Sequence, residues 1–310
     1  MGVAIRIADA TFTKYIGIAE IEEKPCQHVY DDGVVTLAPT CSEGGVKTYT
    51  CTLCGHTYTE VIPATGEHTY VDGYCSVCGD MDIPTTYPVT DTLKGLYYLG
   101  GTQAESIVDR SDNGNTATVK GTITCADGYA TFADNGVTNR LDTPVLPSTE
   151  NKTTIVALFR VPTGIRSIAS TFETGKGGFV LTNDRTYLRA IIDGTANTGA
   201  NVRFTNAGGV AIAVGVENFA LCAMSIDNNS CRVVKDANGS LVELLNTTEN
   251  PCNWVNTISI GGNRTNMSFN DTADIALVSI HEGDMSDAQL RHIFAYVRNK
   301  YAVDKGLTIE

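Results

Sequence analysis

The sequence predicts a mainly β protein, in which an antiparallel β-sandwich is closed by one C-terminal helix and preceded by a small cysteine-rich module and a short N-terminal strand segment. Three observations predict this fold class. From Leu93 onward, short apolar runs are separated by turns rich in Gly, Asn and Asp. One amphipathic helical pattern occurs near the C-terminus. Six of the ten cysteines and three of the five histidines lie between Cys26 and Cys78.

Changes in composition divide the 310 residues into five parts. Residues 1–22 alternate weakly between apolar and polar side chains, so we expect one or two short strands that dock on another surface. Residues 23–80 form the cysteine-rich module. Two prolines among threonines mark residues 81–92 as a stiff linker. The sandwich is expected over residues 93–304, and residues 305–310 are a tail.

Short strands separated by turns such as Asp112-Asn113-Gly114 are typical of two packed antiparallel sheets. The candidate strands are residues 95–99, 116–122, 129–133, 153–161, 168–172, 178–181, 187–192, 201–204, 210–214, 218–227, 230–235, 256–260 and 274–280.

The C-terminal helix has a clear start. Ser286 lies three residues before Gln289, the spacing of a capping box in which each side chain accepts a backbone N–H of the first turn. Apolar residues then recur at helical spacing and predict one buried face. They are Leu290, Ile293, Phe294, Val297 and Tyr301.

The charge balance argues against several classes of partner. Charged residues make up 18% of the chain, and 35 acidic against 22 basic side chains give a net charge of −13. Such a chain, without a Lys/Arg run, is not expected to bind nucleic acid or an anionic membrane surface. It has no apolar run of about 18 residues, so no membrane insertion is expected. No secretory signal is visible at the N-terminus, so we expect synthesis in a cytoplasm, where thiols stay reduced.

Two Cys-x-x-Cys-Gly sequences, at residues 51–55 and 75–79, carry paired thiolates that one tetrahedral zinc ion can bind. The segment is an imperfect repeat in which a His-x-Tyr sequence precedes each pair. Assigning one site to each copy predicts two zinc ions. They are expected to be structural, because four protein ligands leave no open coordination position for catalysis. The expected ligand sets are His28, Cys41, Cys51 and Cys54, and Cys26, His68, Cys75 and Cys78, which leaves His56 over. A disulfide framework is the alternative.

The cysteine-rich module also resembles a known kind of repeat. Pro39-Thr40-Cys41 and Ile62-Pro63-Ala64-Thr65-Gly66, followed by His68-Thr69-Tyr70, are similar to the short zinc-ribbon-like repeats of surface and extracellular proteins in gut Firmicutes. The resemblance covers residues 24–80. It implies a structural or spacer module.

The C-terminal sequence carries a second resemblance. A glycine-rich turn at residues 261–263, an apolar strand at 274–280, a capped helix and a closing Lys-Tyr resemble the end of a concanavalin A-like, laminin-G-type jelly roll. The resemblance spans about residues 91–304. That family includes glucanases and many non-catalytic carbohydrate-binding or adhesion modules.

The sequence favours a non-enzymatic member of that family. Glucanases of this fold carry two Glu residues around an Asp on one strand, and no such array occurs here. Sugar recognition uses aromatic and planar polar side chains, and the candidates for it are Tyr187, Asn201, Arg203, Phe204 and Arg264. A calcium ion at the turn of Asp109, Asp112 and Asn113 is one interpretation, and an Asx-stabilised turn is the favoured one.

These features lead to the hypothesis of a bacteriophage virion protein. Residues 5–12 resemble the strand-forming starts of some phage tail and head-decoration proteins. The N-terminus would then bind other virion proteins, with further copies of the chain as a potential partner, and the sandwich would bind a host-surface glycan. A bacterial cell-surface adhesin is the first alternative, and a glycan hydrolase of the same fold is the second.

Overall fold

The computed structural model describes residues 26–71, 74–133, 139–148, 152–173, 178–183, 188–193, 202–204, 215–226, 230–247, 256–264 and 271–310. The expected strands at 1–22 and 210–214 lie outside these residues. The chain divides into two compact units, one ending at Thr69 and one beginning at Tyr70. Each unit is described by itself.

The first unit is a three-stranded antiparallel sheet in the order β1-β2-β3. Its strands are β1 (Val34–Leu37), β2 (Gly45–Thr50) and β3 (Thr57–Ile62). All four residues of β1 and five of the six in β3 are exposed. Burial of apolar surface therefore contributes little to the stability of this unit, and other interactions must hold it.

Cross-strand aromatic pairs supply some of these interactions. The rings of Tyr49 and Tyr58 are paired in register and stack with centroids 4.7 Å apart. Tyr30 meets Tyr58 edge to face at 4.6 Å, and the ammonium of Lys47 lies 4.7 Å from the Tyr49 ring centroid. Such pairs contribute on the order of 1 kcal/mol each.

The second unit contains a two-stranded hairpin and a β-sandwich. The hairpin pairs β4 (Tyr70–Val71) with β5 (Tyr74–Cys75). The seven-stranded sheet of the sandwich has the order β15-β14-β13-β12-β19-β10-β7, and the eight-stranded sheet has the order β18-β17-β16-β11-β20-β9-β8, with β6 also paired to β20.

The strands of the seven-stranded sheet are β7 (Thr118–Lys120), β10 (Arg140–Asp142), β12 (Arg166–Ser170), β13 (Gly178–Asn183), β14 (Leu188–Asp193), β15 (Val202–Phe204) and β19 (Ser259–Ile260). Those of the eight-stranded sheet are β6 (Leu93–Tyr98), β8 (Thr124–Ala126), β9 (Tyr129–Phe132), β11 (Thr153–Arg160), β16 (Ala220–Ile226), β17 (Cys231–Ala237), β18 (Ser240–Thr247) and β20 (Ala273–Glu282).

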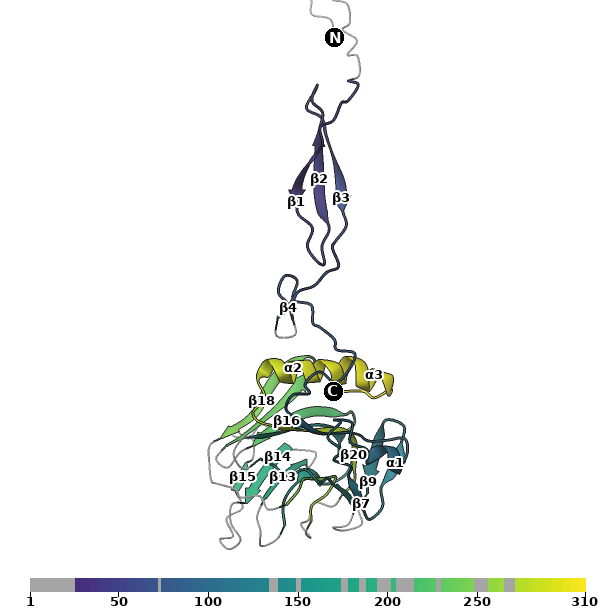
Figure 1. The fold of residues 1–310 in the computed structure, drawn as a ribbon, viewed down its shortest axis with the longest axis vertical. Helices are drawn as coiled ribbons and strands as arrows, with labels where there is room; N and C mark the ends of the chain where they lie inside the picture. Colours follow the sequence, from purple (N-terminus) through teal and green to yellow (C-terminus); the bar gives the residue numbers. More distant parts are fainter. Residues whose placement is uncertain are drawn as a thin grey trace, which may run out of the picture. The chain divides into compact units, whose positions relative to one another are not determined.

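The eight-stranded sheet is buried on both faces. Alternate residues of its central strand β11, such as Ile155 and Phe159, pack against the seven-stranded sheet in the main core. The residues between them, Val156 and Leu158, pack into a second core with the C-terminal helix. Figure 1 shows this helical segment lying across the sheet that contains β16, β18 and β20. The sandwich thus has three layers, and the predicted mainly β fold class with one C-terminal helix is confirmed.

The helical segment begins as the sequence predicts. Ser286 caps α2 (Asp287–Tyr296), and the Ser286–Gln289 capping box is formed in both directions. A π-helical turn, η2 (Val297–Tyr301), and α3 (Ala302–Asp304) continue the segment. A short helix, α1 (Gln103–Ser106), precedes it in the chain. No described helix is long and apolar enough to cross a membrane.

Among the described residues of the sandwich, the sequence pattern missed three strands. They are β8, β10 and β18. The first two are three residues long, which is too short for an alternating pattern to stand out. In β18, the run from Leu241 to Leu245 is mostly apolar around a single Glu and does not alternate strictly. Pairing to a neighbouring strand decides their conformation.

The turn after β6 is held by Asp109. Its carboxylate accepts the backbone N–H groups of Leu96 (3.0 Å), Ser111 (2.9 Å) and Asn115 (2.8 Å). Asn113 donates to the carbonyl oxygen of Leu93 at 2.7 Å. These bonds match the Asx-turn interpretation, because both carboxylate oxygens of Asp109 are already engaged by the protein.

A polar network lies beneath the helix. His281 is fully buried; its Nε2 lies 2.9 Å from the Tyr87 hydroxyl and its Nδ1 3.2 Å from the Thr92 hydroxyl. The Tyr87 ring contacts Tyr296 of α2 edge to face. Burial lowers the pKa of His281 to about 3, so this ring is neutral in the folded protein.

We predict that Asp109→Ala lowers the free energy of unfolding of the sandwich by about 2–3 kcal/mol, because three backbone donors lose their acceptor. Urea denaturation followed by the fluorescence of the single tryptophan, Trp254, measures this change. Asp127→Ala is the control, since that side chain is 90% exposed. Equal losses in the two variants would contradict the role given to Asp109.

We also predict that the sandwich loses about 2 kcal/mol of stability between pH 7 and pH 5 through His281. The unfolded histidine titrates near pH 6.5 and the folded one near pH 3, so acid favours the unfolded state as the pH falls through this window. The variant His281→Gln should remove this part of the pH dependence. His292→Gln, at a half-exposed position, should keep it. An unchanged pH profile in His281→Gln would refute the assignment.

Candidate metal centres and binding face

The structure brings all eight sequence-predicted metal ligands together in two groups. The first group contains Cys26, His28, Cys51 and Cys54, whose ligand atoms all lie within 4.8 Å of one another. The second contains Cys41, His68, Cys75 and Cys78, at the same spacing. Both have the Cys3His composition of a closed structural zinc site.

The membership of the two groups differs from the predicted sets, because Cys26 and Cys41 are exchanged. The reason is the length of a strand. Cys41 lies in the β1–β2 loop, and Cys51 follows the six residues of β2 at the other end of the sheet. A strand of that length spans about 20 Å, so one ion cannot bind both thiolates.

Backbone hydrogen bonds fix this arrangement at each end of the sheet. Thr52 donates to the carbonyl of Val29 at 2.8 Å, which holds the segment with Cys26 and His28 beside the knuckle of Cys51. At the other end, Thr65 and Gly66 donate to the carbonyls of Thr40 and Cys41. Cys41 therefore lies beside the segment that leads to His68.

Each Cys-x-x-Cys-Gly knuckle closes through its glycine. Gly55 and Gly79 have φ angles of 74° and 77°, which other residues rarely adopt. Their N–H groups donate to the carbonyls of Cys51 and Cys75, both at 2.9 Å. The glycines thereby turn the second thiol of each pair back toward the first.

The first group favours a thiolate before any metal binds. Burial alone would raise the pKa of Cys51, but the backbone N–H of Leu53 and the ring of His28 outweigh it and lower the pKa to about 5. In contrast, a hydrogen bond with Cys54 and burial raise the pKa of Cys26 to about 12. None of the described cysteines forms a disulfide, and the sulfurs of Cys26 and Cys51 are 3.9 Å apart. His56 is exposed and contacts the ring of His28 with centroids 4.6 Å apart.

Of the predicted sugar-binding residues, Tyr187 and Asn201 lie outside the described residues. Arg203 and Phe204 belong to β15, at the edge of the seven-stranded sheet. The structure therefore places one complete candidate side chain, that of Arg264. It follows the turn after β19, where Gly261 has a φ of 76° and donates to the carbonyl of Ile168.

The Arg264 guanidinium lies against Asp142, a residue that the sequence did not single out. Its Nη1 is 3.3 Å from Oδ2 of Asp142, and its Nη2 donates to Oγ1 of Thr257 at 2.7 Å. Asp142 also accepts from Arg140 Nε and from Ser259 Oγ, both at 2.8 Å. We call Arg140, Asp142, Ser259 and Arg264 the arginine–aspartate cluster.

This cluster lies on the face of the seven-stranded sheet opposite the core. Leu141 of β10 and Ile260 of β19 point into the main core, so their neighbours Asp142 and Ser259 point to the other side. Strand register continues the row from Ser259 through Ser170 to Val180. Arg264 is therefore the predicted residue whose described side chain reaches this face.

The cluster has one acceptor between two cations. Burial alone would raise the pKa of Asp142, but hydrogen bonds from Arg140 and Ser259 and the charges of both arginines outweigh it and lower the pKa. The side chains of Arg140 and Arg264 are 14% and 19% exposed, so each retains some contact with solvent. The Nε of Arg264 is buried and has no hydrogen-bond partner among the described residues.

A signal for this cluster was present in the sequence. Arg140-Leu141-Asp142 alternates polar and apolar residues, as a half-buried strand does. The pattern is too short to stand out, and its meaning depends on Arg264, which is far away in the chain. Only the fold brings these residues together.

No protein-family model matches the sequence, and a search of curated proteins gives no match. Similar solved structures include the receptor binding domain of botulinum neurotoxin C/D mosaic serotype, with 10% identity over 67% of this chain and 51% of that chain and a TM-score of 0.49. The binding domain of Paraclostridial Mosquitocidal Protein 1 has 12% identity over 64% and 52%, with a TM-score of 0.48.

A third similar structure is the botulinum neurotoxin serotype D ligand binding domain in complex with N-acetylneuraminic acid, with 9% identity over 67% of this chain and 51% of that chain and a TM-score of 0.47. The chain spans about half the length of these structures.

We predict about two zinc ions per chain, measured by native mass spectrometry after expression with zinc. Paired substitutions test the grouping. Cys26→Ser with Cys54→Ser disrupts one group and should leave about one ion. Cys41→Ser with Cys54→Ser disrupts both and should leave none. The opposite result, with no ion in the first variant and one in the second, would support the sets predicted from the sequence repeat.

Proposed function

We propose that the protein is a non-enzymatic virion structural protein whose β-sandwich binds a carbohydrate on the host surface. The arginine–aspartate cluster is the observation that supports the binding part of the proposal. It gathers fixed donors and an ionised acceptor on a sheet face, away from the core. Ligand sites commonly combine a rigid scaffold with a few oriented polar groups of this kind.

The chemistry of the cluster suits a polyhydroxylated ligand. A sugar hydroxyl both donates and accepts, so it can bond a carboxylate and a guanidinium that lie side by side. Arg140 and Arg264 are held by Asp142, and their planar groups therefore lose little freedom on binding. The buried Nε of Arg264 is a donor that a hydroxyl or a bound water would satisfy.

The state of Asp142 supports binding over hydrolysis. A glycan hydrolase needs a general acid with a raised pKa next to a second carboxylate. The arginines and Ser259 instead lower the pKa of Asp142 and favour an ionised acceptor. The hydrolase therefore remains the second alternative, and release of reducing sugar from a bound polysaccharide would favour it.

The virion part of the proposal comes from the sequence. Residues 1–22 have the pattern of short docking strands, and the metal module has the composition of a spacer. Many copies on one particle would raise a weak affinity for each glycan through avidity. A bacterial cell-surface adhesin would share the same sandwich chemistry. Mass spectrometry separates these two interpretations. Detection of the chain in purified phage particles would support the virion protein, and detection only in the bacterial envelope would support the adhesin.

We predict that the full chain binds a subset of glycans on an array, and that Arg264→Ala weakens this binding about tenfold or more. Arg140→Ala should have a similar effect, because it removes the partner that orients Asp142. The control is Arg291→Ala. Arg291 lies on α2, which covers the face of the eight-stranded sheet that points away from the seven-stranded sheet. Trp254 fluorescence verifies that each variant is folded. Absence of binding, or unchanged binding by Arg264→Ala, would contradict the proposal.

A further inference from the structure

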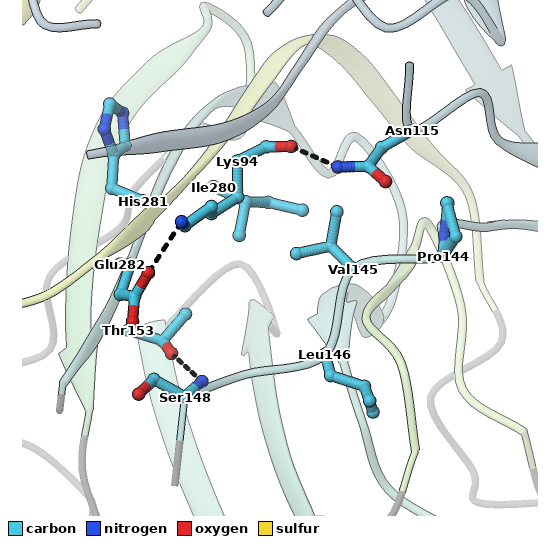
Figure 2. Close-up of a pocket in the computed structure, with 10 residues that line it drawn as sticks. All are labelled: Lys94, Asn115, Pro144, Val145, Leu146, Ser148, Thr153, Ile280, His281 and Glu282. Atoms are coloured by element: carbon cyan, nitrogen blue, oxygen red, sulfur yellow. Dashed lines mark hydrogen bonds and ion pairs between the residues drawn. The ribbon is translucent and has the colours of Figure 1, made fainter. Parts of the chain in front are cut away.

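A cavity of about 270 Å³ opens at one end of the sandwich. It lies where β6 and β11 begin, where β20 ends, and where residues 144–148 cross from one sheet to the other. Figure 2 shows Lys94, Asn115 and Glu282 around the cavity, whose apolar side chains are Pro144, Val145, Leu146 and Ile280. It shares no lining residue with the arginine–aspartate cluster. We call it the β6–β20 pocket.

The walls of this pocket are held in place by hydrogen bonds. Asn115 donates through its side-chain Nδ2 to the carbonyl of Lys94 at 2.7 Å, and its backbone N–H donates to Asp109. On the other wall, the N–H of Ser148 donates to Oγ1 of Thr153 at 2.9 Å, and the carbonyl of Val145 accepts from Ile258. A ligand would therefore meet a formed site and not have to order one.

The charges at the opening cancel. Lys94 Nζ lies 2.7 Å from Oε2 of Glu282, and their side chains are 45% and 42% exposed. These are the only charged groups among the described lining residues, since His281 turns its neutral ring away into the network with Tyr87 (Figure 2). The pair still offers further ammonium protons and carboxylate lone pairs to a ligand.

The apolar part of the pocket has an exposed member. Val145 and Ile280 are buried, at 6% and 1% exposure, whereas the Leu146 side chain is 59% exposed. A flat ligand that covers Leu146 would remove apolar surface from water, at about 25 cal/mol per Å². The pocket thus combines one apolar wall with donors and an acceptor at its rim.

We propose that the β6–β20 pocket binds a single neutral pyranose ring. Its C–H face would lie on Leu146 and Val145, and its hydroxyls would bond Glu282, Lys94 and the side chain of Asn115. The volume is slightly below the range of about 300–1,000 Å³ for sites of drug-sized ligands, which suits one ring and not an oligosaccharide. The inference concerns a second site and does not depend on the arginine–aspartate cluster.

The cancelled charge selects against other ligand classes. An acidic sugar or a free carboxylate would approach a cation that is already paired, with Glu282 repelling it at short range. A zwitterionic amino acid would have to separate the Lys94–Glu282 pair before it could bind. A neutral polyol can form hydrogen bonds with both groups while they remain paired. Its binding therefore carries the smallest electrostatic free-energy cost of the three ligand classes.

The experiment is saturation-transfer difference NMR and titration of the full chain with methyl glucoside, methyl galactoside and methyl mannoside, with glucuronate and leucine as comparison ligands. We expect at least one neutral glycoside to bind more tightly than both comparison ligands. Glu282→Gln should weaken that binding about tenfold or more. Leu146→Ser should also weaken it, because the apolar wall is lost.

A matched control is available on the same end of the sandwich. Lys152 and Asp284 form an ion pair of similar length, 2.8 Å, outside the pocket, and Asp284→Asn should leave binding unchanged. Binding that is lost in Arg264→Ala but kept in Glu282→Gln would assign the sugar to the arginine–aspartate cluster and overturn this proposal alone. No binding by any neutral glycoside would overturn it as well.

Discussion

Burial of both faces of the eight-stranded sheet is the constraint on which the sandwich depends. Strand β11 contributes Ile155 and Phe159 to one core and Val156 and Leu158 to the other, and none of these side chains is exposed. A strand buried on both sides needs a layer on each face. The seven-stranded sheet supplies one and the C-terminal helix supplies the other. The capping box at Ser286 is therefore important beyond the helix, because it starts the layer that covers the second core.

The three-stranded unit is stabilised in a different way. Most of its strand residues are exposed, and its cross-strand rings and the Cys51–Gly55 knuckle take the place of an apolar core. Metal binding to sites of this kind contributes on the order of 10 kcal/mol, which is comparable to the stability of a whole domain. An ion in the group of Cys26, His28, Cys51 and Cys54 would supply the stability that this unit, with so few large buried side chains, does not gain from a core.

Both candidate sugar sites lie outside the two hydrophobic cores. The arginine–aspartate cluster occupies the sheet face opposite the main core, and the β6–β20 pocket lies at the end of the strands. Lys94 and Glu282 of the pocket are partly exposed, and Arg140 and Arg264 of the cluster keep some contact with solvent, while the strands beneath them hold their orientation. The Asp109 turn illustrates the connection, because it holds Asn115, and Asn115 forms one wall of the pocket.

The sequence by itself determined the features that depend on neighbouring residues. These include the capped helix, most described strands of the sandwich, the Asx turn at Asp109 and the eight Cys and His residues that gather in the two groups. Each follows from the types and the spacing of residues that are close together in the chain. Only the tertiary structure decided which of these residues lie in the same group, because the length of β2 separates Cys41 from Cys51. It also decided that Arg264 meets Asp142, since strand register joins residues more than a hundred positions apart, and no local pattern records that register.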